Sequence, residues 1–159
     1  LAEAIAAAVR FRLGCCANFM IGHRNGECVD IEIENEEFDV LYPKDGILVH
    51  TNHFISPLLP IRPRQDTCKR KFTDTFVRLG RADKLIRKKG HDISEEDIME
   101  ILRDHVEYPS GICRHEDVNQ PEGKRMGTVF SMIVNLTQGN IYYCKGNPCG
   151  MDYKIYTLS

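Results

Sequence analysis

Val29-Asp30-Ile31-Glu32-Ile33-Glu34 is a stretch in which apolar and acidic residues alternate at every step. Successive side chains of a β-strand point to opposite faces, so this alternation predicts a strand with one apolar, buried face and one acidic face. We expect the acidic face to lie in water and to have no further role.

The segments around this strand predict one helix followed by an antiparallel meander. An Asn25-Gly26 pair before the strand is a strong signal for a tight hairpin. The expected elements are a helix from Leu1 to about Leu13, ended by Gly14, a buried strand over 16–22, and strands over 38–42 and 47–50.

The rest of the chain predicts helices and then strands. Residues 66–89 are basic and compatible with a helix, with a break at Gly80. Ser94 and Asp97 resemble a capping box for a helix that ends near Val106. Strands are expected over 128–136, 141–144 and 151–158. This order predicts an α+β fold with helices packed on antiparallel sheets, in a single domain over residues 1–159.

Composition excludes several classes of partner. The 159 residues carry a net charge of -2, which favours neither nucleic acid nor a membrane. Seven cysteines without a repeated C-x-x-C pair indicate free thiols, and an intracellular compartment, cytoplasmic or peroxisomal, is favoured. The start at Leu1, without Met or a signal peptide, is typical of a chain cut from a longer protein.

The first candidate site is His50-Thr51-Asn52-His53-Phe54, at the end of a predicted strand. An asparagine there can donate its amide N–H to a developing oxyanion, or it can cap a turn with its own backbone. The two histidines are candidate zinc ligands, but residues three apart on a strand point to opposite faces. We therefore expect no metal at this position.

The second candidate site is the loop Tyr108–His115, which holds Cys113, Arg114 and His115 side by side. Cys113 and His115 could form a thiol–imidazole catalytic pair. Arg114 could hold a substrate carboxylate or carbonyl, or form a surface salt bridge.

A third candidate is Gly14-Cys15-Cys16, because autocatalytic cleavage at a Gly-Cys bond releases a nucleophilic N-terminal cysteine. The residues alone leave these alternatives open.

Four segments together resemble the isopenicillin N acyltransferase (acyl-CoA:6-aminopenicillanic acid acyltransferase) family. Residues 46–53 resemble its hydrophobic-His-Thr-Asn-His segment, and residues 108–114 its Tyr-Pro-x-Ser-Ile-Cys-Arg segment. Residues 128–133 and 146–149 are similar to the following strand and a later loop. The resemblance covers essentially the whole chain, and Gly111 departs from it where the family has Ser.

The resemblance implies the C-terminal part of an αββα sandwich of the N-terminal-nucleophile (Ntn) hydrolases. In such enzymes a cysteine released by self-cleavage attacks a small acyl amide or thioester and passes the acyl group to water or an amine, without a cofactor. Asn52 then contributes to the oxyanion hole, Arg114 lies in the active site, and Phe54 shapes the acyl pocket. Cys15 and Cys16 align with small residues at the start of a strand, so the nucleophile and its accompanying Asp are expected in a missing upstream segment.

Two classes of function follow from the resemblance. In the first, Asn52 and Arg114 face one cleft and belong to an enzyme completed by the missing segment. In the second, the chain is a truncated, non-catalytic relative that binds a ligand or a partner chain.

Overall fold

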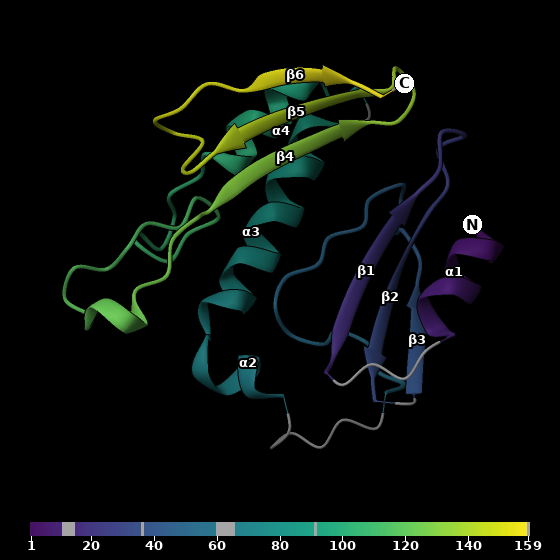
Figure 1. The fold of residues 1–159 in the computed structure, drawn as a ribbon, viewed down its shortest axis with the longest axis horizontal. Coiled ribbons are helices and arrows are strands. Elements are labelled where there is room, and N and C mark those ends of the chain that lie inside the picture. Colours follow the sequence, from purple (N-terminus) through teal and green to yellow (C-terminus); the bar gives the residue numbers. More distant parts are fainter. Residues whose placement is uncertain (11–14, 36, 60–65, 91, 159) are drawn as a thin grey trace. The chain divides into compact units, whose positions relative to one another are not determined.

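The computed structural model describes residues 1–10, 15–35, 37–59, 66–90 and 92–158. They form two compact units, Leu1–Phe76 and Val77–Ser159 (Figure 1). Each unit holds a three-stranded antiparallel sheet, and helices accompany both sheets, which confirms the predicted α+β class. Among the described residues, no helix has the length and apolar character needed to cross a bilayer. The single-domain assignment stays a prediction.

The N-terminal sheet is the predicted meander, in the order β1 (Ala17–Gly22), β2 (Cys28–Glu34) and β3 (Glu37–Leu41). Gly26 turns the chain between β1 and β2 with a φ of 88°, a conformation that glycine adopts without steric cost. Helix α1 (Ala2–Val9) packs Leu1, Ile5 and Val9 on the apolar face of β2. Gly14 and the predicted end of this helix lie outside the described residues.

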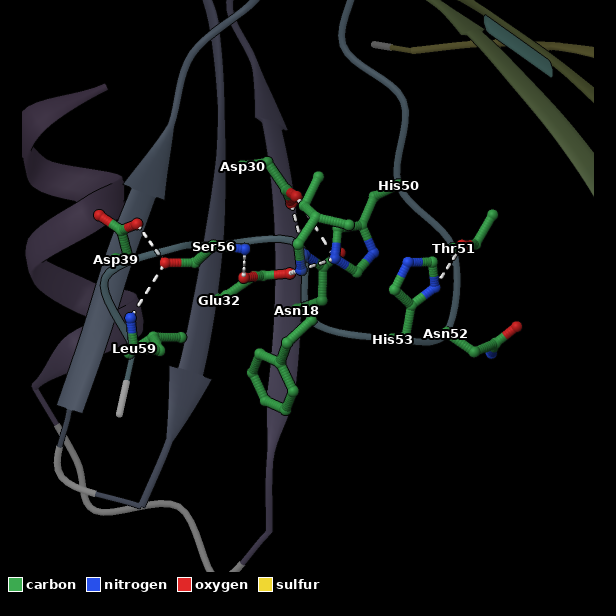
Figure 2. A network of polar contacts seen from close by, with 12 residues as sticks. Asn18, Asp30, Glu32, Asp39, His50, Thr51, Asn52, His53, Ser56 and Leu59 are labelled. Carbon is green, nitrogen blue, oxygen red and sulfur yellow. Dashed lines mark hydrogen bonds and ion pairs between the residues drawn. The ribbon is translucent and has the colours of Figure 1, made fainter. Parts of the chain in front are cut away.

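The acidic face of β2 does not lie in water, so that expectation was wrong. Asp30 and Glu32 are both 0% exposed, like Ile31 on the opposite face. The segment after His50 crosses this face and supplies hydrogen-bond donors to both oxygens of Glu32 (Figure 2). Burial of a carboxylate is tolerable when such donors replace water. The alternation therefore separates two buried faces of different chemistry.

Two other strand predictions also need correction. Residues 16–22 do not form a buried strand: β1 lies at an edge of its sheet, and Phe19 and Met20 are exposed. Residues 47–50 do not form a strand, because their backbone pairs only at the isolated bridge between Lys44 and Ile47. An apolar run becomes a strand only where a neighbouring strand takes up its backbone hydrogen bonds.

The basic region forms two helices, α2 (Thr67–Lys71) and α3 (Asp74–Lys89). They are separated at Phe72 and Thr73, whereas Gly80 lies inside α3 without breaking it, so the predicted break was misplaced.

The C-terminal unit continues with α4 (Glu95–Leu102), which begins at the predicted capping box of Ser94 and Asp97. A short 3-10 helix, η1 (Glu122–Lys124), precedes the second sheet. The sheet is a meander of β4 (Phe130–Asn135), β5 (Asn140–Lys145) and β6 (Lys154–Thr157), close to the predicted strands. Helix α4 ends four residues before the predicted end near Val106, and the chain then enters the Tyr108–His115 loop.

Candidate functional site

A pocket of about 200 Å³ lies beside the acidic face of β2 in the N-terminal unit. It is formed by the start of β1, by Glu32 and by the irregular segment that follows His50. Its lining residues are Cys16, Ala17, Asn18, Glu32, His50, Thr51, Asn52, His53 and Phe54. The pocket therefore includes the predicted residues Asn52 and Phe54. It also includes Cys16, which was set aside as a nucleophile.

Glu32 holds the segment that carries Asn52. Its Oε1 accepts from the backbone N–H of Ile55 at 2.7 Å and lies 2.6 Å from Nε2 of His50. Its Oε2 accepts from the backbone N–H of Ser56 at 2.8 Å. Figure 2 shows this carboxylate between the imidazole and the backbone. The Ser56 hydroxyl also donates to Asp39 on β3 at 2.5 Å, so two strands hold the same segment.

The same carboxylate controls the charge of His50. Burial by itself lowers the pKa of His50, but the hydrogen bond to Glu32 and the charges of Asp30 and Glu32 outweigh it, so the pKa is raised. His50 is therefore favoured as an imidazolium that donates to Glu32.

Asp30 completes the polar network. Its Oδ1 accepts from Asn18 at 2.6 Å, while its Oδ2 lies 3.9 Å from Nε2 of His50. Within the described residues this Oδ2 is buried without a hydrogen-bond partner. Burial raises the pKa of Asp30, although the nearby His50 and the Asn18 amide act in the opposite direction.

Thr75 holds the other side of the Asn52 segment. Its hydroxyl donates to Thr51 Oγ1 at 2.9 Å and accepts from the backbone N–H of Asn52 at 3.0 Å. His53 Nδ1 lies 2.9 Å from the same oxygen. With the Thr75 proton directed to Thr51, His53 donates from Nδ1 to Thr75; with that proton directed to His53, the bond has the opposite direction. The N–H of Phe54 donates to Asp66, whose side chain also caps α2.

The result is a short segment whose backbone is fixed on both sides. In Figure 2 the Asn52 side chain points away from the His50–Glu32 pair. A polar side chain on a backbone held in this way can meet a ligand with little reorganisation, which is the condition for strong electrostatic stabilisation.

Arg114 lies in the C-terminal unit, and its backbone is equally well held. Its N–H donates to Thr128 Oγ1 at 2.9 Å. Its carbonyl accepts from Thr128 N at 2.8 Å and from Asn147 Nδ2 at 2.7 Å. Asn52 and Arg114 belong to different units, so their meeting in one cleft stays a prediction.

Gly111 has a steric reason to be glycine in this chain. A Cβ at this position would lie 2.8 Å from the carbonyl oxygen of Val106 and 3.2 Å from that of Asp104. The loop crosses the end of α4 at this point, and the N–H of Cys113 donates to the Asp104 carbonyl at 3.0 Å. The close approach leaves no room for a side chain at position 111 of this chain.

The structure brings Cys113 and His115 together, with Sγ 3.7 Å from Nε2. Cys113 is 0% exposed, which does not suit a nucleophile that must reach a substrate. The two side chains are therefore close enough to form a catalytic pair, but a substrate cannot reach the thiol of Cys113.

Sequence reasoning missed Glu32, Asp30 and Thr75 as parts of the site. A signal for Glu32 and Asp30 was present: they lie on a strand with predicted strands on both sides, where full solvation of either face is not assured. Thr75 lies in a basic helical region, and no local pattern distinguishes it.

These features define an α+β protein with a polar pocket built from a strand edge and a rigid loop that carries an asparagine. A sequence model of the acyl-coenzyme A:6-aminopenicillanic acid acyl-transferase family matches residues 1–149, so the chain belongs to this family of Ntn-type acyltransferases. The resemblance found in the sequence is thereby confirmed. No curated protein matches the chain.

Proposed function

We propose that this chain supplies the oxyanion-binding part of a cysteine amidohydrolase or acyltransferase that transfers a small acyl group through an acyl-enzyme. The nucleophilic cysteine comes from a segment outside these 159 residues. The observation that carries the proposal is the position of Asn52, on the wall of the pocket and on a backbone fixed by both Glu32 and Thr75.

The proposed reaction assigns a distinct task to each residue. The thiolate adds to the carbonyl carbon of an amide or thioester, and the carbonyl oxygen becomes an oxyanion that accepts from the Asn52 amide N–H. The α-amine of the nucleophilic cysteine takes the thiol proton and passes it to the leaving amine or thiolate, which leaves an acyl-enzyme; water or an amine then attacks the thioester carbonyl and releases the cysteine thiolate. Phe54 contacts the acyl chain, and Arg114 holds a carboxylate or carbonyl of the substrate.

Cys16 is the rival nucleophile, because it lines the same pocket as Asn52. Partial desolvation raises the pKa of its thiol, and the charge of Glu34 raises it further. A raised pKa lowers the thiolate fraction at neutral pH, which weakens a cysteine as a nucleophile. We therefore assign Cys16 to the pocket wall.

The test uses the protein with its upstream segment and a panel of small acyl amides and acyl thioesters. Asn52→Ala is expected to lower kcat by roughly 10²–10³-fold. Asn25→Ala, in the β1–β2 turn, is the matched control and should retain full activity. Equal activities of the two variants would remove Asn52 from the mechanism.

Mass spectrometry of the trapped acyl-enzyme decides between the nucleophiles. The proposal expects the acyl group on a cysteine of the upstream segment, and an acyl group on Cys16 would refute it. If the protein with its upstream segment binds these ligands but forms no acyl-enzyme, the chain is a binding module instead.

A further inference from the structure

Four metal-ligating side chains converge in the C-terminal unit, remote in sequence from the segment that carries Asn52. They are His105, Cys113, His115 and Cys149, and their ligand atoms all lie within 4.8 Å of one another. We propose that these residues form a structural site for Zn²⁺ that takes no chemical part in the acyl transfer.

Four of the six distances between the ligand atoms are close to those of a tetrahedral zinc site, and all six are within 4.8 Å. Zn–S bonds of about 2.3 Å and Zn–N bonds of about 2.0–2.1 Å give tetrahedral edges of roughly 3.8 Å for S···S, 3.6 Å for S···N and 3.3 Å for N···N. The two sulfur atoms lie 3.6 Å apart. Nε2 of His115 lies 3.7 Å from Cys113 Sγ, 3.4 Å from Cys149 Sγ and 3.0 Å from Nε2 of His105.

The donor set is also the correct one for this ion. Two thiolates and two imidazoles form a closed tetrahedral set, the usual composition of structural zinc sites. On binding, each thiol loses one proton to solvent and each imidazole offers a neutral nitrogen. Four protein ligands leave no open position for a substrate, so the proposed role is structural.

The backbone near the ligands is held by hydrogen bonds of its own. The N–H of Cys113 donates to Asp104, next to His105, and the N–H of His115 donates to Pro109 at 2.8 Å. Arg103 donates to the carbonyl of Pro148 at 3.0 Å, directly before Cys149. Such preorganisation lowers the conformational entropy lost when the metal binds.

Asn147 is the expected outer-sphere partner. Its Nδ2 lies 3.4 Å from Cys113 Sγ and 2.7 Å from the Arg114 carbonyl. An N–H donor to a metal thiolate stabilises its negative charge and orients it. Arg114 lies between two ligands, so the ion would fix the backbone from which its side chain projects.

A disulfide between Cys113 and Cys149 is the competing explanation for their proximity. The sulfur separation of 3.6 Å is far longer than the roughly 2.05 Å of an S–S bond. A disulfide would also leave the two imidazoles without a reason to converge.

The test is metal binding by the whole chain, purified with reductant and freed of metal by a chelator. One equivalent of Co²⁺ is expected to produce the intense visible absorption of tetrahedral thiolate-bound cobalt, and Zn²⁺ should remove that absorption stoichiometrically. Cys149→Ser and His105→Asn should each abolish it. Both residues are exposed, so folding of the variants is expected and can be checked by circular dichroism.

Matched controls are Cys28→Ser and His23→Asn, which remove the same groups outside the cluster and should leave the absorption unchanged. Asn147→Leu should weaken binding about 10-fold or more. No tetrahedral absorption, equal binding by Cys149→Ser, or a Cys113–Cys149 disulfide in the native mass spectrum would each overturn the proposal. The assay contains no substrate, so its outcome is independent of the acyl-transfer proposal.

Discussion

Glu32→Gln is the substitution that most directly tests how the Asn52 segment is held. It changes the volume of the side chain very little but removes the charge and one acceptor. The amide oxygen can still accept from Ile55 N and His50 Nε2, which share Oε1 in the native protein. The new NH₂ group then faces the N–H of Ser56, which loses its acceptor.

The expected loss of stability is the sum of two effects. A buried N–H left without an acceptor costs about 1–3 kcal/mol. The bond from His50 also ceases to be an imidazolium–carboxylate bond, and charge-assisted bonds are roughly twice as strong as neutral ones. Together they predict a decrease of about 2–4 kcal/mol in the free energy of unfolding.

Denaturant unfolding of the chain measures this change, and Glu34→Gln is the matched control. Glu34 lies on the same strand and face but is partly exposed, so its substitution should stay within about 0.5 kcal/mol. NMR titration of His50 provides a second measurement, since its pKa should fall when Glu32 loses its charge. If both variants unfold alike and the titration of His50 does not move, Glu32 does not hold the segment.

Four further substitutions test His50 and other parts of the chain. The raised pKa of His50 contributes stability that is fully present below its unfolded pKa of about 6.5 and is lost as pH rises through the folded pKa. In His50→Gln the free energy of unfolding, measured at a series of pH values in that window, should therefore depend less on pH. Ser94→Ala should destabilise α4 by about 1 kcal/mol, measured by thermal unfolding, and an unchanged Tm would contradict the role of Ser94 as a cap. Gly111→Ala should cost about 1–3 kcal/mol in denaturant unfolding because its Cβ would meet Val106 O. Gly80→Ala, inside α3 with open space around it, should add about 0.5–1 kcal/mol, and the reverse order of these two glycine variants would be inconsistent with the structure.

Local patterns predicted most of the helices and strands. The alternation of β2, the Asn25-Gly26 turn and the Ser94 cap each depend on neighbours within a few residues, and all three were confirmed. The predicted solvent exposure of the acidic face of β2 was wrong because residues distant in the sequence cover that face. The donors to Glu32 lie 18 to 24 residues later, in a segment with no regular structure.

The same reasoning separates the two sites. Asn52 could be singled out as a candidate because the His-Thr-Asn-His pattern is contiguous, and the structure shows that Asn52 lines a pocket, while its role stays a prediction. The His105–Cys149 cluster could not, because Cys149 follows Cys113 by 36 residues and only the loop around α4 brings them together. A spacing rule for zinc sites with paired cysteines does not detect such a set.

The two buried faces of β2 also bear on how the chain avoids misfolding. If β2 slipped by one residue against β1 and β3, Ile31 and Ile33 would exchange places with Glu32 and its acidic neighbours. The carboxylates would then face the apolar side of α1, where no hydrogen-bond donors meet them. The isoleucines would face the segment after His50, whose N–H groups would have no acceptor. Both errors are costly and occur together, so the sheet has one viable register once the segment after His50 is in place.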